Sequence, residues 1–332
     1  MKILIIRLSS IGDIVLTQPI VQKLHEVFPE AELHYLTKQQ YAVIPEYFGV
    51  SIKVIPYAKT FGFHYFLSQQ KYDYVFDLQA KFSSFLLKLA CGTAYNFTYD
   101  KQHWLRLAIV RHKTDKTINS TLDSYQTALI KAGKALQNDS LSGELSNPKL
   151  FIKTTDIEQM SARIQIPEGK KVVALFPGAT YLTKMYPAES FINVIQKAGV
   201  NFHFWLLGGK AETGLTYNLN FATADRSTDF GGKFSLSELI AVIALADIVI
   251  TNDSGPMHIA AALEKPQIAI FGATHPKLGF KPLNPNASVI VKNTSCQPCS
   301  LHGGELCPRQ HFACMLSIKP DEIVSLLKTL AS

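Results

Sequence analysis

The sequence lacks the phosphate-binding motifs of the commonest nucleotide enzymes. It has no G-x-G-x-x-G after its first apolar run and no G-x-x-x-x-G-K-[ST] anywhere, so the fingerprints of a dinucleotide dehydrogenase and of a P-loop NTPase are absent. No Asp-x-Asp pair follows an expected strand, which argues against metal-dependent transfer. We therefore expect no metal and no cofactor, and a nucleotide would have to be held by other groups.

Long apolar runs are also missing. No segment approaches the length of about 18 apolar residues that a membrane span needs. The apolar run at the N-terminus is broken by Arg7 and Asp13 before it reaches the length of a signal-peptide core. We expect a cytoplasmic protein, and any membrane contact would be peripheral.

The size and charge of the chain narrow the possibilities further. With 332 residues, it is too long for one ordinary core, and we expect two domains of about 150 residues each. The net charge of +7 and a pI near 9.0 favour an anionic partner, which could be nucleic acid, an acidic membrane or a phosphorylated small molecule. Basic residues concentrate at 101–116, which is either a solvated face or an acceptor-binding surface.

Apolar runs and helical patterns alternate along the chain. This alternation predicts doubly wound parallel sheets, and the polar stretch 138–148 predicts a linker between a first domain at 1–150 and a second at 151–332. The last helix could pack back on the first domain. Strands are expected at 3–8, 32–36, 53–55, 74–78, 171–176, 202–207, 248–251 and 267–271, and helices at 14–28, 187–198, 236–246 and 256–263.

The loop after the first strand reads Ser9-Ser10-Ile11-Gly12-Asp13. In open α/β sheets ligands bind beyond the carboxyl ends of the strands, so a carboxylate at Asp13 would face a cleft and could act as a general base. Gly12 would allow close approach of a ligand. The alternative is that Asp13 serves as the N-cap of the following helix.

A second polar turn, at 251–258, lies between an apolar strand and an Ala-rich helix. Asp253 or Ser254 can cap this helix, and Gly255 permits the tight turn before Pro256. Unpaired N–H groups and the positive end of the helix dipole favour phosphate here. His258 lies in the first turn, where a phosphate contact competes with a purely structural role.

Two further strand ends carry charged candidates. Lys184, in the loop after the strand at 171–176, could neutralise a departing diphosphate without a metal ion. Glu212, after the strand at 202–207, could accept hydrogen bonds from a ribose or a base. The alternative for both is a solvated surface side chain.

Three stretches together resemble glycosyltransferase family 9, the ADP-heptose:lipopolysaccharide heptosyltransferases. They are Ile6 to Val15, Pro177-Gly178-Ala179 with Lys184 and Pro187, and Thr251 to Ala262. The resemblance runs over nearly the whole chain in the expected order. It implies a GT-B architecture, in which two Rossmann-like doubly wound domains face each other across a cleft.

The resemblance also implies an activity and a site. It implies an inverting, metal-independent transfer of heptose from ADP-heptose to the inner core of lipopolysaccharide, on a lipid-anchored anionic acceptor at the inner face of the inner membrane. Asp13 and Lys184 would be catalytic. Residues that would bind the nucleotide sugar are Thr180, Glu212, Asp253, Ser254, Gly255 and His258, and residues that would bind the acceptor are Ser10, Gly12 and Lys59.

Other functions remain compatible with the residues alone. A glycosyltransferase using another nucleotide sugar, or a sugar-nucleotide epimerase on the same scaffold, would share the phosphate-binding turn. A non-catalytic binder of nucleotide sugar or nucleic acid would use the +7 charge, but the sequence does not interleave basic residues with aromatics over a continuous face, and we expect no nucleic-acid partner.

Four of the five cysteines cluster near the C-terminus, at Cys296, Cys299, Cys307 and Cys314. A reducing compartment favours a metal site or free thiols over disulfides. The second pair lacks the short spacing of a zinc ribbon. Zinc, disulfide and free thiol all remain open.

Overall fold

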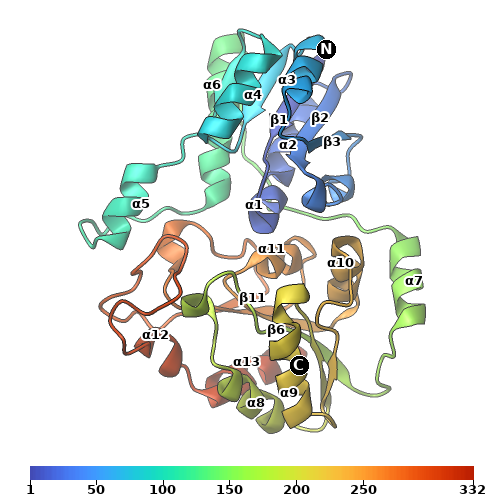
Figure 1. Cartoon of the computed structure of the whole chain (residues 1–332), viewed down its shortest axis with the longest axis vertical. Helices are drawn as coiled ribbons and strands as arrows, with labels where there is room; N and C mark the ends of the chain where they lie inside the picture. Colours follow the sequence, from blue (N-terminus) through green and yellow to red (C-terminus); the bar gives the residue numbers. More distant parts are fainter. The chain divides into compact units, whose positions relative to one another are not determined.

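The computed structural model describes residues 1–332, and the chain forms two compact units. Unit 1 comprises Met1–His103 and Ser120–Phe151, and unit 2 comprises Trp104–Asn119 and Ile152–Ser332. Each unit contains one parallel sheet with helices on both faces (Figure 1). None of the helices combines the length and the apolar composition of a membrane span.

Unit 1 is built on a five-stranded parallel sheet in the order β3-β2-β1-β4-β5. The central strand β1 is buried from Ile3 to Ile6, as expected for a parallel strand covered on both faces. The strands are β1 Lys2–Ile6, β2 Glu32–Lys38, β3 Lys53–Tyr57, β4 Tyr74–Asp77 and β5 Asn96–Thr98. The helices are α1 Ile11–Val15, α2 Gln18–Val27, α3 Phe61–Gln69, α4 Phe82–Cys91 and α6 Thr121–Leu136, with 3₁₀ turns at Gln39–Tyr41, Ile44–Tyr47 and Asp139–Ser142.

The single helix expected at 14–28 is wrong in detail. The chain forms α1 and α2 with a break at Leu16 and Thr17. Pro19 is the second residue of α2, where its missing N–H costs nothing. A continuous helix would place this proline in its interior, so the chain starts a new helix instead.

Unit 2 is built on a six-stranded parallel sheet in the order β11-β10-β9-β6-β7-β8. Its strands are β6 Lys171–Phe176, β7 Phe202–Leu206, β8 Ser227–Asp229, β9 Ile248–Asn252, β10 Gln267–Ile270 and β11 Ala287–Ile290. Its helices are α5 His103–Val110, α7 Thr154–Arg163, α8 Ala188–Lys197, α9 Thr213–Ala222, α10 Leu236–Leu245, α11 Gly255–Ala262, α12 Ala313–Leu316 and α13 Pro320–Ala331, with 3₁₀ turns at Leu182–Lys184, Lys210–Glu212 and Pro276–Leu278.

The C-terminal helix α13 packs in the core of unit 2. Its buried residues Ile323, Val324 and Leu327 share a hydrophobic cluster with β6, β7 and β9. Lys292 adds an ion pair to Glu322, at 2.6 Å between Nζ and Oε2. Sequence reasoning left packing of this helix on the first domain open, and the structure gives its contacts within unit 2.

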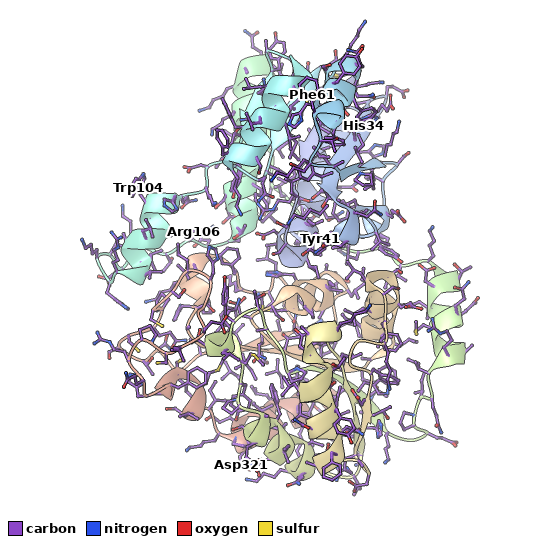
Figure 2. The ribbon with its side chains drawn as sticks, viewed as in Figure 1. His34, Tyr41, Phe61, Trp104, Arg106 and Asp321 are labelled. Atoms are coloured by element: carbon purple, nitrogen blue, oxygen red, sulfur yellow. The ribbon has the colours of Figure 1, made fainter.

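The basic segment 101–116 is not a uniformly solvated face. Arg106 is buried and its guanidinium lies 4.8 Å from the centre of the Phe280 ring. Ile109 packs beside it against Leu278. Figure 2 shows Arg106 together with Trp104, which is exposed. The segment is therefore anchored to unit 2 by a cation–π contact and a small apolar cluster.

Each sheet reverses its strand order once, and this reversal marks a site in each unit. In unit 1 the reversal lies between β1 and β4, and in unit 2 it lies between β6 and β9. Ligands of doubly wound folds bind outside the carboxyl ends of the strands at such switch points. The loops after β1, β6 and β9, which carry most of the predicted site residues, lie at these two positions.

Candidate functional site

Asp13 lies at the switch point of unit 1, in the first turn of α1, and its carboxylate is held by several donors. Oδ2 lies 2.8 Å from a terminal nitrogen of Arg7. The same oxygen accepts from the backbone N–H of Ser10 at 3.1 Å and from its hydroxyl at 2.9 Å. The hydroxyl of Tyr125 on α6 donates to Oδ1 at 3.2 Å. The carboxylate is thus fixed in orientation at the carboxyl edge of β1.

The two buried partners of Asp13 hold their protonation states. Burial opposes the charge of the Arg7 guanidinium, but the neighbouring Asp13 carboxylate raises the pKa of Arg7 above its usual value. Burial raises the pKa of the Tyr125 hydroxyl well above its usual value, although Arg7 works in the opposite direction. Arg7 therefore stays cationic, and Tyr125 stays a hydrogen-bond donor.

The N-cap alternative for Asp13 needs a correction. Ser10 is the N-cap of α1, and Asp13 is the third helical residue, whose carboxylate reaches back to the Ser10 N–H. This is the carboxylate half of a capping box. Asp13 therefore does stabilise the helix end, but from a different position than the one considered, and its contacts with Arg7 and Tyr125 go beyond capping.

The predicted acceptor residues are divided between two loops of unit 1. Ser10 is exposed and Gly12 is buried in the same turn as Asp13. Lys59 is exposed in the loop after β3. Since β2 separates β3 from β1 in the sheet, Lys59 belongs to the same edge but not to the immediate surroundings of Asp13.

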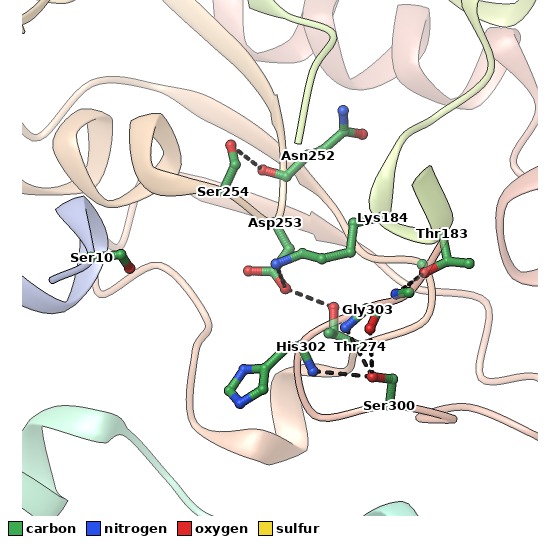
Figure 3. Close-up of polar contacts among 12 residues, drawn as sticks. Ser10, Thr183, Lys184, Asn252, Asp253, Ser254, Thr274, Ser300, His302 and Gly303 are labelled. Carbon is green, nitrogen blue, oxygen red and sulfur yellow. Dashed lines mark hydrogen bonds and ion pairs between the residues drawn. The ribbon is translucent and has the colours of Figure 1, made fainter. Parts of the chain in front are cut away.

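Lys184 and Asp253 meet at the switch point of unit 2 (Figure 3). Nζ of Lys184 lies 2.9 Å from Oδ2 of Asp253, and the two side chains are 14% and 9% exposed. Asp253 also accepts a hydrogen bond from the hydroxyl of Thr274 at 2.6 Å. Neither residue is a solvated surface side chain, so this alternative for Lys184 is wrong.

The N-terminus of α11 lies directly beside this ion pair in the chain. Ser254 is the N-cap, but its hydroxyl donates to the carbonyl of Asn252 at 3.2 Å and makes no capping bond. Gly255 and Pro256 form the first turn, and His258 follows, buried. A helix start without a side-chain cap presents N–H groups and a partial positive charge, which suit an anion.

Glu212 follows β7 and lies against the loops of two neighbouring strands. Its Oε2 accepts from the Gly209 N–H at 2.6 Å. A Cβ built on Gly178 would lie 2.4 Å from Cγ of Glu212, and one on Gly208 would lie 2.8 Å from its Cβ. Glycine is therefore required in both loops for Glu212 to occupy this position. Thr180 is exposed in the same loop as Gly178.

The C-terminal cysteine region covers the aliphatic part of Lys184. A Cβ on Gly303 would lie 2.9 Å from Cγ and Cδ of Lys184. The carbonyl of Gly303 accepts from the Ser300 hydroxyl at 2.9 Å (Figure 3). All five cysteines are free thiols, and no group of three or more His, Cys, Asp or Glu side chains is arranged to hold a metal ion.

Sequence reasoning missed the residues that hold the predicted ones in place. The sequence shows that Arg7 interrupts the first apolar run, but it did not predict the ion pair between Arg7 and Asp13. Asn252 belongs to the turn that the sequence marked, but its role was not predicted. Its side-chain nitrogen donates to the carbonyl of Pro177 at 2.8 Å, and its side-chain oxygen accepts from the Tyr186 N–H at 3.0 Å. It thereby joins the loops after β6 and β9. Nothing in the sequence marked Tyr125.

Comparison with known sequences gives a consistent result. The sequence profile of glycosyltransferase family 9 (heptosyltransferase) matches residues 63–306. Lipooligosaccharide heptosyltransferase 2 of Campylobacter jejuni (serotype O:2) is 26% identical over 340 residues, which cover 99% of this chain and 98% of that protein. Lipopolysaccharide heptosyltransferase 2 of Escherichia coli K12 is 22% identical over 348 residues, with 99% and 98% coverage.

Comparison with solved structures shows the same fold. The Escherichia coli ADP-heptose lipopolysaccharide heptosyltransferase II superposes with a TM-score of 0.79 at 21% identity, covering 99% of this chain and 98% of that one. The family 9 glycosyltransferase of Veillonella parvula gives a TM-score of 0.80 at 19% identity, with 99% and 96% coverage. The predicted class, a GT-B fold of two Rossmann-like parallel α/β domains, is confirmed.

Proposed function

Since the chain belongs to glycosyltransferase family 9, the heptosyltransferases, we propose that it transfers heptose from ADP-heptose to the inner core of lipopolysaccharide, with inversion at the anomeric carbon and without a metal ion. Because the chain belongs to this family, it is a glycosyltransferase. The donor and acceptor are supported by the names of its relatives, which act in lipopolysaccharide or lipooligosaccharide synthesis, and by the related heptosyltransferase WaaC, whose solved structures include complexes with ADP and with an ADP-heptose analogue.

The observation that carries the proposal is the nearly buried Lys184 at the switch point of unit 2. Its ammonium group is held by Asp253 at 2.9 Å, directly before the uncapped start of α11. A fixed cation and a helix N-terminus together can stabilise the negative charge that develops on a departing diphosphate. This arrangement supplies from the chain itself the positive charge that other transferases take from a metal ion.

In the proposed reaction, Asp13 is the general base. The acceptor hydroxyl loses its proton to the carboxylate as its oxygen attacks the anomeric carbon, and the diphosphate leaves. Arg7 and Tyr125 act as positioning residues, because they hold the carboxylate in one orientation. Ser10, Gly12 and Lys59 are proposed to meet the acceptor.

The donor contacts in the proposal are spread over three loops of unit 2. Lys184, Ser254, Gly255 and His258 are proposed to hold the diphosphate together with Thr180. Glu212 is proposed to bind the ribose, since its position between the loops after β6 and β7 is fixed by Gly178 and Gly208. Asp253 is proposed to hold Lys184 and to face the sugar of the donor.

Replacing Asp13 by Asn tests the base assignment. We expect Asp13→Asn to abolish transfer while ADP binding stays near normal, because the donor contacts are proposed on unit 2. The melting temperature should fall, because the buried cation of Arg7 loses its counterion. Full transfer by this variant would refute the assignment.

The chain offers a matched control for this variant. Ser120-Thr121-Leu122-Asp123 opens α6 with the same pattern as Ser10-Ile11-Gly12-Asp13, and Asp123 is likewise the third helical residue. Asp123 is exposed, and its backbone N–H donates a hydrogen bond to the Ser120 hydroxyl at 3.0 Å. Asp123→Asn should therefore remove only the negative charge from the first turn of α6 and leave transfer intact. Equal loss in both variants would show that Asp13 acts through helix stability.

The donor is tested by thermal-shift screening with ADP-, UDP-, GDP- and CDP-sugars. Stabilisation by the ADP sugar above the others supports the proposal. Stabilisation by another nucleotide alone would overturn the ADP-heptose assignment. Conversion of the donor sugar without any acceptor would indicate an epimerase, and binding without turnover would indicate a non-catalytic binder.

The proposed acceptor is anchored in lipid, so the enzyme is proposed to act at the inner face of the inner membrane as a peripheral protein. The excess of basic residues, with a net charge of +7, supports attraction to an anionic surface.

A further inference from the structure

The outward face of α3 and α4 carries an unusual concentration of large apolar side chains. The two helices pack beside each other on the sheet of unit 1 (Figure 1). Phe61 is 89% exposed and Phe82 is 76% exposed, and Phe61 is labelled in Figure 2. We call the following seven exposed residues the α3/α4 apolar face: Phe61, Tyr65, Phe66, Phe82, Phe85, Leu86 and Leu89.

This face is separate from the core of unit 1. Leu67 of α3 and Leu87 and Cys91 of α4 point inward and join the hydrophobic cluster on the sheet. The exposed residues of α4 follow the spacing i, i+3, i+4 and i+7, which normally forms the buried stripe of a helix. Helix α4 is therefore apolar on two sides, and the outer side has no partner within the chain. Single exposed apolar residues are ordinary, but seven large ones on two helices that pack together are typical of an interaction site.

The charge around the face favours one kind of partner. Residues 59–72 and 78–99, which contain both helices, include no Asp or Glu. Lys71 and Lys81 are exposed at helix ends beside the face. Aromatic side chains combined with lysines and without acidic residues are typical of surfaces that rest in the interface of an anionic bilayer. A protein partner of opposite charge would not require so many exposed aromatic residues.

The position of the face suits a lipid-anchored substrate. Phe61 and Phe82 are the first residues of helices that follow β3 and β4. In a parallel sheet these helices begin at the carboxyl edge, where the loop with Asp13 also lies. We infer that the α3/α4 apolar face docks onto the surface of an anionic lipid bilayer, so that an acceptor anchored there presents its sugar to this edge. The inference rests on the proposed function for one premise only, which is that the acceptor is anchored in a lipid bilayer.

Vesicle flotation with the full chain tests the inference without any substrate. Vesicles of phosphatidylethanolamine with phosphatidylglycerol are compared with vesicles of phosphatidylcholine. We expect binding to the anionic vesicles, and a loss of about tenfold in partitioning for each of Phe61→Ser and Phe82→Ser, since a buried phenylalanine contributes at least that factor. The melting temperature should not change, because both side chains are exposed.

Phe221→Ser is the matched control, because Phe221 is 79% exposed on α9 of unit 2. Equal losses in all three variants, or no binding of the unaltered protein, would overturn the inference. If Phe61→Ser and Phe82→Ser instead dissociate a dimer in light scattering while vesicle binding is unchanged, the face binds a second copy of the chain and the inference is wrong.

A transfer assay separates this inference from the proposed function. Phe82→Ser should lower transfer to an acceptor held in anionic vesicles and leave transfer to a deacylated, soluble acceptor unchanged. Vesicle binding without transfer to either acceptor would refute the proposed function and leave the docking surface standing. Transfer to both acceptors without vesicle binding would refute the docking surface alone.

Discussion

Substituting the two members of the Lys184–Asp253 pair should have the same effect on stability and opposite effects on nucleotide binding. The charged atoms lie 2.9 Å apart, and both side chains are largely buried. At an effective dielectric constant of about 20, such charges attract each other by about 6 kcal/mol before the cost of removing them from water is subtracted. Breaking a buried pair by removing one partner typically costs about 3–5 kcal/mol. In a domain of this size the lower figure corresponds to a fall in melting temperature of about 6–12 °C.

The two substitutions differ in the charge that they leave behind. Lys184→Met leaves the Asp253 carboxylate, which repels a diphosphate, and we expect ADP binding to weaken by tenfold or more. Asp253→Asn leaves the Lys184 ammonium without its counterion, while the Asn side chain can still accept from the Thr274 hydroxyl. We expect ADP to bind this variant about tenfold more tightly, a gain of about 1.4 kcal/mol.

Calorimetric titration with ADP and thermal melts with and without ADP measure both effects. ADP should raise the melting temperature of Asp253→Asn by more than that of the unaltered protein, because the nucleotide replaces the missing charge. The double variant should recover part of the lost stability, since neither charge is left alone. Lys171→Met is a matched control, because the pair Lys171–Asp247 has a separation of 3.2 Å but is far more exposed.

The reasoning would be refuted by one of two results. If Asp253→Asn weakens ADP binding as Lys184→Met does, Asp253 contacts the nucleotide directly and does not compete with it for Lys184. If Lys184→Met leaves ADP binding unchanged, the ion pair is structural and the lysine does not meet the diphosphate.

Three further predictions concern other parts of the chain. Gly178→Ala should displace Glu212, because a Cβ at this position would lie 2.4 Å from Cγ of Glu212. We expect a loss of about 1–3 kcal/mol in the free energy of unfolding and loss of donor binding in a calorimetric titration. Gly214→Ala is the control and should bind the donor normally, because a Cβ there would meet nothing within 4 Å. Burial lowers the pKa of His34, His203 and His275, so the unfolded chain binds more protons than the folded chain as the pH falls. The melting temperature should therefore fall as the pH drops below about 6.5. A melting temperature that stays constant from pH 7.5 to 5.5 would contradict this prediction. Burial raises the pKa of Cys91 to about 12 and the pKa of Cys314 to about 11. For Cys307, backbone N–H groups outweigh the effect of burial and lower the pKa. Timed alkylation followed by mass spectrometry should therefore label Cys307 before Cys91 and Cys314.

Local sequence signals were sufficient for the elements that carry the site. Strand β6 was predicted with the bounds that it has, because a continuous apolar run ends at Pro177 and Gly178. Strand β9 and helix α11 were predicted to within a residue, since Gly255 and Pro256 separate them. Apolar runs that end at Gly and Pro thus position Lys184 and the turn at 253–258 from the sequence alone.

Contacts between distant segments could not be predicted in this way. Asp13 and Tyr125 are separated by 112 positions, and their contact depends on how α6 packs on the sheet. Helix α4 was not predicted, although Phe82, Phe85, Leu86 and Leu89 have helical spacing. The spacing does not show that these residues lie on the exposed side of the helix, because that depends on how α4 packs on the sheet.

The two units hold their proposed functional charges in different ways, and the difference follows from the partners. Arg7 is buried, its side chain also donates to the carbonyl of Leu78, and it lies against the Tyr125 ring. It cannot leave Asp13 without losing all of these contacts, so the Asp13 carboxylate keeps its orientation when an acceptor enters.

Lys184 has a different kind of partner. Asp253 keeps its hydrogen bond to Thr274 when the lysine moves, and the lysine ends a flexible aliphatic chain. An incoming diphosphate can therefore take over the ammonium group without disturbing the turn at the start of α11. A base needs a counterion that holds it still, whereas a phosphate-binding cation needs one that it can exchange, and these opposite requirements suit the roles proposed for Asp13 and Lys184.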